Sequence, residues 1–277
     1  MLLGVIIAVS VAAALGICLL SGAFLGLTWL WLLPVLVLGF VLLGIVLAFL
    51  FLLVLASVVD LKQEQKEDSK LYRKTVELYL QSAMKPIGWN ISTKGMEKLP
   101  KEGRFLLVCN HVALADPVVL LHVFSGKQLA FISKQENQSM FLVGKLMHKL
   151  LCQPINREND KEALKTIIKC IQILREDKAS VAVFPEGYIH EDKKLHHFRP
   201  GVFKIAKKTE VPIVVCTMKN TKDAIDNLLH LRKTDIEVSV LDVITPERYA
   251  DLGTTELAQQ IYELMAADLG PDQVSQE

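Results

Sequence analysis

The stretch FLLVCNHVALADP, from Phe105 to Pro117, places an apolar strand directly ahead of a polar turn and a helix start. Its five leading apolar residues are typical of a strand that is buried on both faces of a sheet. His111 and Asp116 follow this strand, and Pro117 suits the first position of a helix. Because sites in open α/β sheets form at the carboxyl ends of strands, the stretch predicts an α/β domain with its site residues here.

Strands and helices alternate over the rest of the chain. Further apolar runs indicate strands over 129–132, 181–184, 211–216 and 236–241. Helical patterns lie over 116–124, 141–151 and 160–176, the last with Asn159 or Asp160 as its cap. The predicted apolar face of that helix comprises Leu164, Ile167, Ile168, Ile171 and Leu174. This order predicts a layered α/β domain with a mostly parallel or mixed sheet over residues 91–250.

The C-terminal part of the chain, 251–277, is expected to form a helix and a tail. From Gly270 onward the sequence is polar and has no apolar periodicity. We therefore expect the tail to be frayed.

Residues 1–59 have a different character, because they contain no Asp, Glu, Lys, Arg or His. About 20 apolar residues span a bilayer as a helix, so the segment has room for two crossings. Leu2 to Leu20 is the first, Leu30 to Val59 contains the second, and Gly22 to Thr28 lies between them. The segment predicts a transmembrane helical hairpin. A cleaved signal peptide is the alternative, but its basic start is missing and a second apolar run follows at once.

Residues 60–90 link the hairpin to the domain. Basic side chains follow the second apolar run at Lys62, Lys66, Lys70, Arg73 and Lys74, and the turn between the runs carries none. Such residues favour the cytoplasmic side, so we expect a two-span membrane protein with its α/β domain on the cytoplasmic face. Apolar residues at helical spacing from Leu71 onward predict an amphipathic helix, which either packs on the domain or lies near the membrane.

Charge and cysteine content exclude several classes of protein. A formal net charge of +1 argues against a dedicated nucleic-acid binder. The five cysteines are odd in number and form no Cys-x-x-Cys pair, so neither a disulfide framework nor a zinc site is indicated. His190, His196 and His197 are close in sequence, but their spacing matches no ligand set, and we predict no metal site.

Three strand ends carry the residues from which chemistry is expected. If the turn after the first strand brings Asp116 to His111, the carboxylate can hold the imidazole in one tautomer and make it a general base. A later strand runs into Phe184-Pro185-Glu186-Gly187, which presents a carboxylate and backbone N–H groups at the same sheet edge. Another contains Val211-Pro212-Ile213. Each signal alone is more often structural, but the ordered set is uncommon.

With these motifs the sequence resembles the glycerolipid acyltransferase family, from about Ile91 to Tyr249. His111 to Asp116 matches the family's His-x4-Asp block, and Cys152 to Arg157 is similar to its second block, which ends in a basic residue. Phe184 to Gly187 matches the third block, and Val211 to Ile213 the fourth. The apolar N-terminus also fits a membrane-anchored member of this family.

The resemblance implies transfer of an acyl group from acyl-CoA or acyl carrier protein to the hydroxyl of a lysophospholipid, without a cofactor. The acceptor it implies is 1-acylglycerol-3-phosphate, which gives phosphatidic acid. His111 would take the hydroxyl proton while Asp116 orients the imidazole, and Arg157 would hold the acceptor phosphate. The remaining substrate-binding residues that the resemblance implies are Asn110, Pro185, Glu186 and Gly187.

The third block departs from the family pattern. The family usually continues with Thr-Arg-Ser, whereas this chain reads Tyr188-Ile189-His190, so an expected arginine is missing. A substitute phosphate contact would come from Lys193, Lys194 or Arg199, unless these are solvated surface charges. The departure leaves open a different lysolipid acceptor. It also leaves open a non-catalytic lipid-binding membrane protein, against which the intact His and Asp count.

Overall fold

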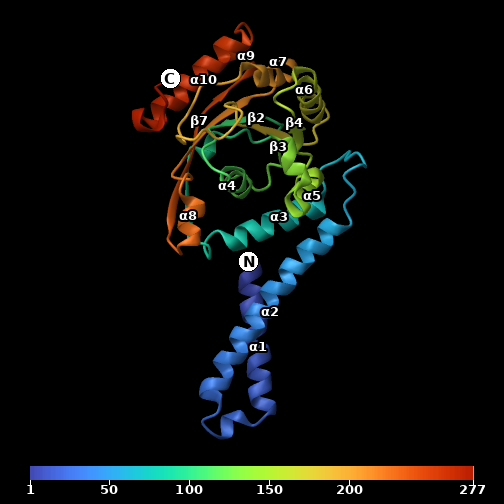
Figure 1. The fold of residues 1–277 in the computed structure, drawn as a ribbon, viewed down its shortest axis with the longest axis vertical. Helices are drawn as coiled ribbons and strands as arrows, with labels where there is room; N and C mark the ends of the chain where they lie inside the picture. The colour runs from blue at the N-terminus through green and yellow to red at the C-terminus, as the bar shows by residue number, and fades with distance from the viewer. Residues whose placement is uncertain (277) are drawn as a thin grey trace.

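The computed structural model describes residues 1–276, which form an apolar helical hairpin and an α/β domain (Figure 1). The hairpin consists of α1 (Leu2–Leu20) and α2 (Trp29–Ser57), joined through a 3₁₀ turn at Ala23–Leu25. Both helices are long and apolar enough to cross a membrane. They pack closely where a Cβ on Gly44 would lie 2.6 Å from Cγ2 of Ile6. The two predicted apolar helices are therefore present, as a hairpin.

Helix α3 (Lys70–Ala83) packs between the hairpin and the α/β domain. The Tyr72 and Tyr79 hydroxyls donate to the carbonyls of Leu55 and Ala48 in α2, at 2.8 and 2.7 Å. At its other end, Oγ of Ser82 accepts the N–H of Leu2 at 2.8 Å. The helix predicted in the linker is present, and it packs on the protein along much of its length.

The linker also buries an ion pair. Nη2 of Arg73 lies 2.7 Å from Oδ1 of Asp68, and the side chains are only 6% and 2% exposed. The Gln128 amide also donates to Asp68, at 3.3 Å. Because Gln128 belongs to the α/β domain, the ion pair ties the linker to it.

Replacing Asp68 with alanine is expected to lower the free energy of unfolding by roughly 3–5 kcal/mol, because Arg73 would keep a buried charge without its partner. Denaturant unfolding in detergent measures the loss. The matched control is Glu136→Ala, which removes the partner of an exposed Lys134 and should cost less than about 1 kcal/mol. Equal losses in the two variants would contradict the role assigned to the buried pair.

The domain is built on a seven-stranded sheet with the order β1-β7-β6-β2-β5-β3-β4. All neighbouring strands are parallel except β6 and β7, which makes the sheet mixed, as predicted. The strands are β1 (Trp89–Lys94), β2 (Leu106–Cys109), β3 (Leu129–Lys134), β4 (Gln153–Ile155), β5 (Ser180–Val183), β6 (Ile213–Lys219) and β7 (Thr234–Ile244).

The sequence predicted the five inner strands but not β1 and β4. Both lie at the edges of the sheet. Strand β1 is mostly polar and exposed, and β4 has only three residues, one of them Pro154. Edge strands need neither an apolar run nor full hydrogen bonding, so they leave a weak pattern.

Helices cover both faces of the sheet. The helices of the domain are α4 (Asp116–Val123), α5 (Phe141–Lys149), α6 (Asp160–Arg175), α7 (Lys204–Thr209), α8 (Ala224–Leu229), α9 (Pro246–Tyr249) and α10 (Thr254–Leu269). Alternate residues of β2 face opposite ways, with Leu106 and Val108 in the core under α6, α7 and α10. Leu107 and Cys109 face the core that includes residues of α3 and α4. Short 3₁₀ turns lie at Met96–Lys98, Gln135–Ser139, Pro200–Phe203 and Pro271–Gln273.

The predicted apolar face of α6 was partly wrong. Asn159 caps the helix as predicted, accepting the N–H groups of Lys161 and Glu162. However, Leu164 and Ile168 are about half exposed, while Cys170 and Ile173 are buried. The buried face of α6 is therefore rotated from the predicted one, because it runs through Thr166, Cys170 and Ile173 as well as Ile167 and Leu174.

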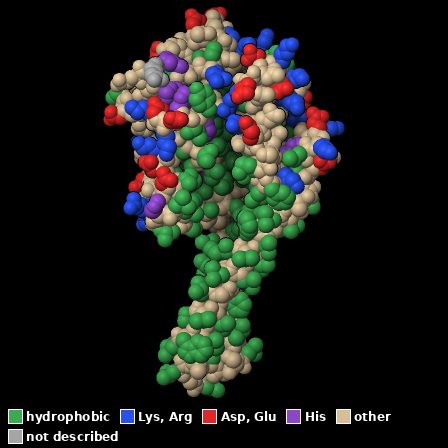
Figure 2. Space-filling view, viewed as in Figure 1, with side chains coloured by type: hydrophobic (Ala, Val, Ile, Leu, Met, Phe, Trp, Pro, Cys, Tyr) green, Lys and Arg blue, Asp and Glu red, His purple; other side chains and the backbone are tan. Residues whose placement is uncertain are grey.

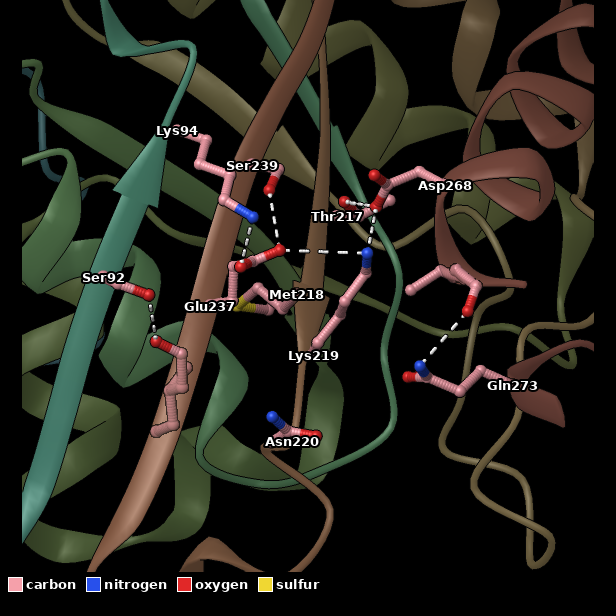
Figure 3. A network of polar contacts seen from close by, with 12 residues as sticks. Ser92, Lys94, Thr217, Met218, Lys219, Asn220, Glu237, Ser239, Asp268 and Gln273 are labelled. Atoms are coloured by element: carbon pink, nitrogen blue, oxygen red, sulfur yellow. Dashed lines mark hydrogen bonds and ion pairs between the residues drawn. The ribbon is translucent and has the colours of Figure 1, made fainter.

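The C-terminal tail pairs with the domain as far as Ser275, which corrects the prediction of a frayed end for this part. The N–H of Leu195 donates to the carbonyl of Gln273, and the N–H of Ser275 donates to the carbonyl of Leu195, both at 2.9 Å. Figure 3 shows that α10, the helix before the tail, is also tied to the sheet: Nζ of Lys219 in β6 lies 3.0 Å from Oδ2 of Asp268. Backbone pairing explains why a polar sequence is held in place.

Candidate active site

His111 and Asp116 meet in the turn after β2, as the sequence predicted. Nδ1 of His111 lies 3.0 Å from Oδ2 of Asp116. The same oxygen accepts the N–H groups of Val112 and Ala113 at 2.8 and 2.9 Å. Asp116 is fully buried at the start of α4. Since the carboxylate accepts a hydrogen bond from Nδ1–H, Nε2 is left as the ring nitrogen for proton transfer.

Phe184 supports the imidazole from the neighbouring strand. The rings of His111 and Phe184 stack with centroids 4.1 Å apart and planes 16° apart. Phe184 directly follows β5, which pairs in parallel with β2. Because neighbouring parallel strands end at the same edge, the Phe-Pro-Glu-Gly motif lies beside His111, as expected.

Glu186 connects two loops through backbone hydrogen bonds. Its Oε1 accepts the N–H of His111 at 2.7 Å, and its Oε2 accepts the N–H of His196 at 3.0 Å. The residue is 2% exposed. Its carboxylate thus holds the backbone at His111, a role that no pattern in the sequence signalled.

Burial raises the pKa of Glu186 from 4.5 to about 8, although the two N–H groups favour the charged form. A raised pKa in the folded protein means that folding favours the protonated carboxyl. This contribution to stability is complete below about pH 4.5 and is lost as the pH rises through about 8.

The Glu186→Gln variant is expected to lose this pH dependence. In the wild type the free energy of unfolding should fall by roughly a few kcal/mol between pH 4.5 and 8 because of this group. The glutamine does not titrate, so the variant should show a flatter profile, with a constant offset from one disrupted N–H contact. Denaturant unfolding at several pH values compares both with Glu102→Gln, a matched change at an exposed position. Identical slopes in wild type and Glu186→Gln would contradict the assignment.

Asn110 fastens β2 to β6. Its Nδ2 donates to the carbonyl of Met218 at 3.0 Å, and its Oδ1 accepts the N–H of the same residue at 2.8 Å. The side chain therefore lies between the ends of β2 and β6, and the residue is buried. The structure therefore gives the predicted substrate-binding asparagine a positioning contact next to His111.

A cavity of about 450 Å³ opens beside Phe184. Its polar rim includes Arg157, Arg199 and Lys204, and Pro185 and Gly187 also line it. Its apolar wall comprises Ile132, Ile155, Leu164, Ile167, Val183 and Val202. Three of the predicted substrate-binding residues, together with Arg199, thus surround one space. Lys204 was not singled out in the sequence, because nothing there indicates where it points.

Gly187 makes room for Arg199. The Pro185 carbonyl accepts the N–H of Arg199 at 2.9 Å. A Cβ on Gly187 would lie 3.0 Å from Nε of Arg199, and the glycine has a φ of +93°, which other residues rarely adopt. The Arg199 guanidinium lies 5.7 Å from the centroid of the Tyr188 ring. The turn therefore fixes the arginine at the rim of the cavity.

The two arginines are close enough to affect each other. Burial lowers the pKa of Arg157 first, and the charge of Arg199 lowers it further. Within residues 1–276, neither guanidinium forms an ion pair with a carboxylate. The cavity lining holds three cations, Arg157, Arg199 and Lys204, and one carboxylate, Asp160, so it is net positive and suited to an anion.

Lys193 and Lys194 do not line this cavity. Nζ of Lys193 donates to the carbonyl of Lys222 at 3.1 Å. The nearby histidines form a ring stack, with His190 and His196 at a centroid distance of 3.5 Å, and His196 contacts Asp192. Of the three cations named for the missing arginine, the structure brings only Arg199 to the cavity.

Comparisons with a family model and with individual proteins both point to acyltransferases. Residues 90–219 match the family model described as Acyltransferase. A probable 1-acyl-sn-glycerol-3-phosphate acyltransferase of Mycoplasma pneumoniae is 31% identical over 145 residues, which are 51% of this chain and 53% of the relative. The Borreliella burgdorferi 1-acyl-sn-glycerol-3-phosphate acyltransferase is 25% identical over 61% of this chain and 69% of its own length. The chain thus spans about half the length of the first of these relatives.

A solved structure shares the fold. The crystal structure of the 1-acyl-sn-glycerophosphate (LPA) acyltransferase PlsC from Thermotoga maritima has a TM-score of 0.61 and 20% identity. The match covers 79% of this chain and 86% of that one. The segment that the family model matches, residues 90–219, begins in β1 and ends with β6. It therefore contains His111, Asp116, Arg157 and the Phe-Pro-Glu-Gly turn. Residues 90–219 therefore match the acyltransferase family over the part of the chain that carries these residues.

Proposed function

We propose that this protein transfers a fatty acyl group from a thioester to the hydroxyl of a lysophospholipid. The observation that carries the proposal is the His111–Asp116 pair, held at 3.0 Å and packed on Phe184, which also lines the arginine-rimmed cavity. A general base linked through Phe184 to a cation-lined cavity fits an acceptor that carries both a hydroxyl and a phosphate.

The reaction needs one base and no covalent enzyme intermediate. Nε2 of His111 takes the proton as the acceptor oxygen attacks the thioester carbonyl, and Asp116 stabilises the imidazolium that forms. The tetrahedral intermediate then expels the thiolate, which takes the proton from His111. The products are the acylated lipid and the free thiol of CoA or acyl carrier protein, and no cofactor takes part.

The acceptor we propose is 1-acylglycerol-3-phosphate, and its product is phosphatidic acid. Arg157, Arg199 and Lys204 supply three positive charges for a phosphate monoester, which carries close to two negative charges at neutral pH. The names of the relatives from Mycoplasma and Borreliella support the same acceptor.

The hairpin would anchor the enzyme in the membrane that supplies its substrates. Figure 2 shows hydrophobic side chains covering the hairpin and continuing onto the hollowed face of the domain above it. We propose the cytoplasmic face for the domain, because the basic residues of the linker follow α2 and none lies in the hairpin turn. Thiol labelling of an added cysteine at the exposed Lys66 in sealed spheroplasts tests this: reaction with an impermeant reagent would place the domain outside.

A lysolipid panel tests the function. Purified protein is given labelled acyl-CoA or acyl carrier protein with lysolipids that carry a phosphate monoester, a phosphodiester or no phosphate. We expect transfer chiefly to 1-acylglycerol-3-phosphate. Preferred transfer to a phosphodiester lysolipid would favour the other-lysolipid alternative, and no transfer with any pair would favour a lipid-binding protein.

A further inference from the structure

The turn between α8 and β7 exposes two leucines. Leu229 is 75% exposed and Leu231 is 94% exposed. Ile225, one turn earlier on the same face of α8, is 41% exposed. A single exposed leucine needs no explanation, but neighbouring ones at the tip of a turn indicate a surface that contacts an apolar partner.

This turn lies at the end of the domain from which the hairpin extends. The start of α1 is fixed to the end of α3, because Oγ of Ser82 accepts the N–H of Leu2 at 2.8 Å. Shortly after α3, the carbonyl of Gly88 accepts the N–H of Thr234 at 2.9 Å, directly after the exposed turn. Figure 1 shows the lower end of α8 close to the level of the N-terminus. The exposed leucines thus lie close to the level at which α1 begins.

Basic residues flank the leucines. His230, Arg232 and Lys233 lie in the same turn, and all three are exposed. The carboxylates of α8, Asp223 and Asp226, lie just before the helix or in its first turn, and Asp235 after the turn accepts the Asn90 amide at 2.8 Å. Apolar side chains beside arginine and lysine are typical of segments that rest in the interface of a bilayer with anionic lipids.

A second apolar surface lies at the start of α5. Met140 and Phe141 are 52% and 54% exposed, and the Lys145 ammonium lies 4.5 Å from the centroid of the Phe141 ring. Helix α5 packs against α2 of the hairpin. In Figure 2 hydrophobic side chains gather at the lower end of the domain on both sides of the hairpin. The apolar surface of the hairpin therefore continues onto the domain.

We propose that residues 229–233 insert into the lipid interface and, with the start of α5, form a second membrane contact of the domain. A hairpin alone fixes the domain to the membrane but lets it tilt. A second contact beside the hairpin would fix this tilt, and with it the orientation of the active site relative to the bilayer. The inference rests on the proposed function for the purpose of this orientation, whereas the lipid contact itself can be measured without catalysis.

Site-directed fluorescence quenching tests the contact directly. Leu231→Cys in the full chain is labelled with an environment-sensitive dye and reconstituted into vesicles of phosphatidylcholine and phosphatidylglycerol. The native cysteines are all buried, so the added thiol is the one that reacts. The matched control is Gln260→Cys, an exposed position on α10. We expect lipids brominated near the headgroup end of the chains to quench the dye at 231 and not at 260.

Equal quenching at the two positions would overturn the proposal. A dye at 231 that is shielded from water but insensitive to brominated lipid would indicate a protein partner or a second copy, and would also overturn it. Quenching at 231 in a protein that acylates no lysolipid would leave the membrane contact standing while the proposed function failed. The membrane contact and the proposed acyl transfer can therefore be disproved independently.

Charged substitutions test the consequence for the enzyme. Leu229→Asp with Leu231→Asp changes only exposed side chains, so the fold should persist. We expect roughly a tenfold rise in KM for lysolipid presented in vesicles, as burial of a leucine side chain is worth about that factor. Activity on a short-chain, water-soluble acceptor should stay unchanged. An unchanged KM in vesicles, or an equal loss with the soluble acceptor, would contradict a role in orientation.

Discussion

Replacing His111 with alanine is expected to lower kcat for acyl transfer by roughly 10²–10⁴-fold, the usual contribution of a positioned general base. The reason is geometric: Nδ1 is engaged by Asp116 at 3.0 Å, and Nε2 is left to take the proton of the acceptor hydroxyl. KM for the acceptor should change little, because the cations that would hold its phosphate come from other elements. Steady-state kinetics with labelled acyl donor measure both constants.

The matched control is His197→Ala. Its ring packs on Tyr262 with centroids 4.9 Å apart, and it makes no contact with the His111–Asp116 pair. We expect its kcat to stay within about twofold of the wild type, since its ring packs on Tyr262 and a group that makes no transition-state contact contributes nothing to the chemical step. Equal activity of His111→Ala and wild type would remove the proposed base. A thermal scan of each variant separates a loss of chemistry from a loss of folded protein.

Replacing Arg199 with alanine is expected to raise KM for 1-acylglycerol-3-phosphate by roughly 10–100-fold, which corresponds to one charge-assisted hydrogen bond of about 1.5–3 kcal/mol. Arg199 lines the cavity with Arg157, and its backbone is fixed by the Pro185 carbonyl at 2.9 Å. An acceptor without a phosphate monoester should be affected much less. Acceptor titrations with both kinds of lysolipid measure the difference.

The chain offers a close control in Lys193→Ala with Lys194→Ala. These lysines precede Arg199 in the same loop but do not line the cavity, so the double variant should keep its KM within about twofold. Equal effects of the Arg199 variant and the lysine variant would contradict a specific phosphate contact. An equal effect of Arg199→Ala on all acceptors would show that the arginine supports the fold of the turn instead.

Local patterns predicted the parts of the protein that depend on neighbours in sequence. The two apolar helices of the hairpin are evident because a bilayer-spanning helix needs a long run without charge. The inner strands are equally evident, because strands buried on both faces read as continuous apolar runs. His111 and Asp116 lie in a single turn, so a separation of five residues was enough to pair them.

Contacts between distant residues decided the rest. Glu186 binds backbone groups 75 and 10 residues away, and the C-terminal tail pairs with Leu195, contacts that no residue type announces in advance. The edge strands β1, which is mostly polar, and β4, which has only three residues, gain their structure from a partner strand.

The sequence by itself determined an α/β domain behind an apolar hairpin and a histidine–aspartate pair at a strand end, because these follow from hydrophobic runs and short-range spacing. Only the tertiary structure decided which of the three candidate cations, Lys193, Lys194 or Arg199, lines the cavity. The turn at Gly187, with its φ of +93° and no side chain, lets Arg199 reach the cavity, while Lys193 points to another loop. The direction in which a side chain extends depends on backbone angles and on packing, and these cannot be read from the order of the residues.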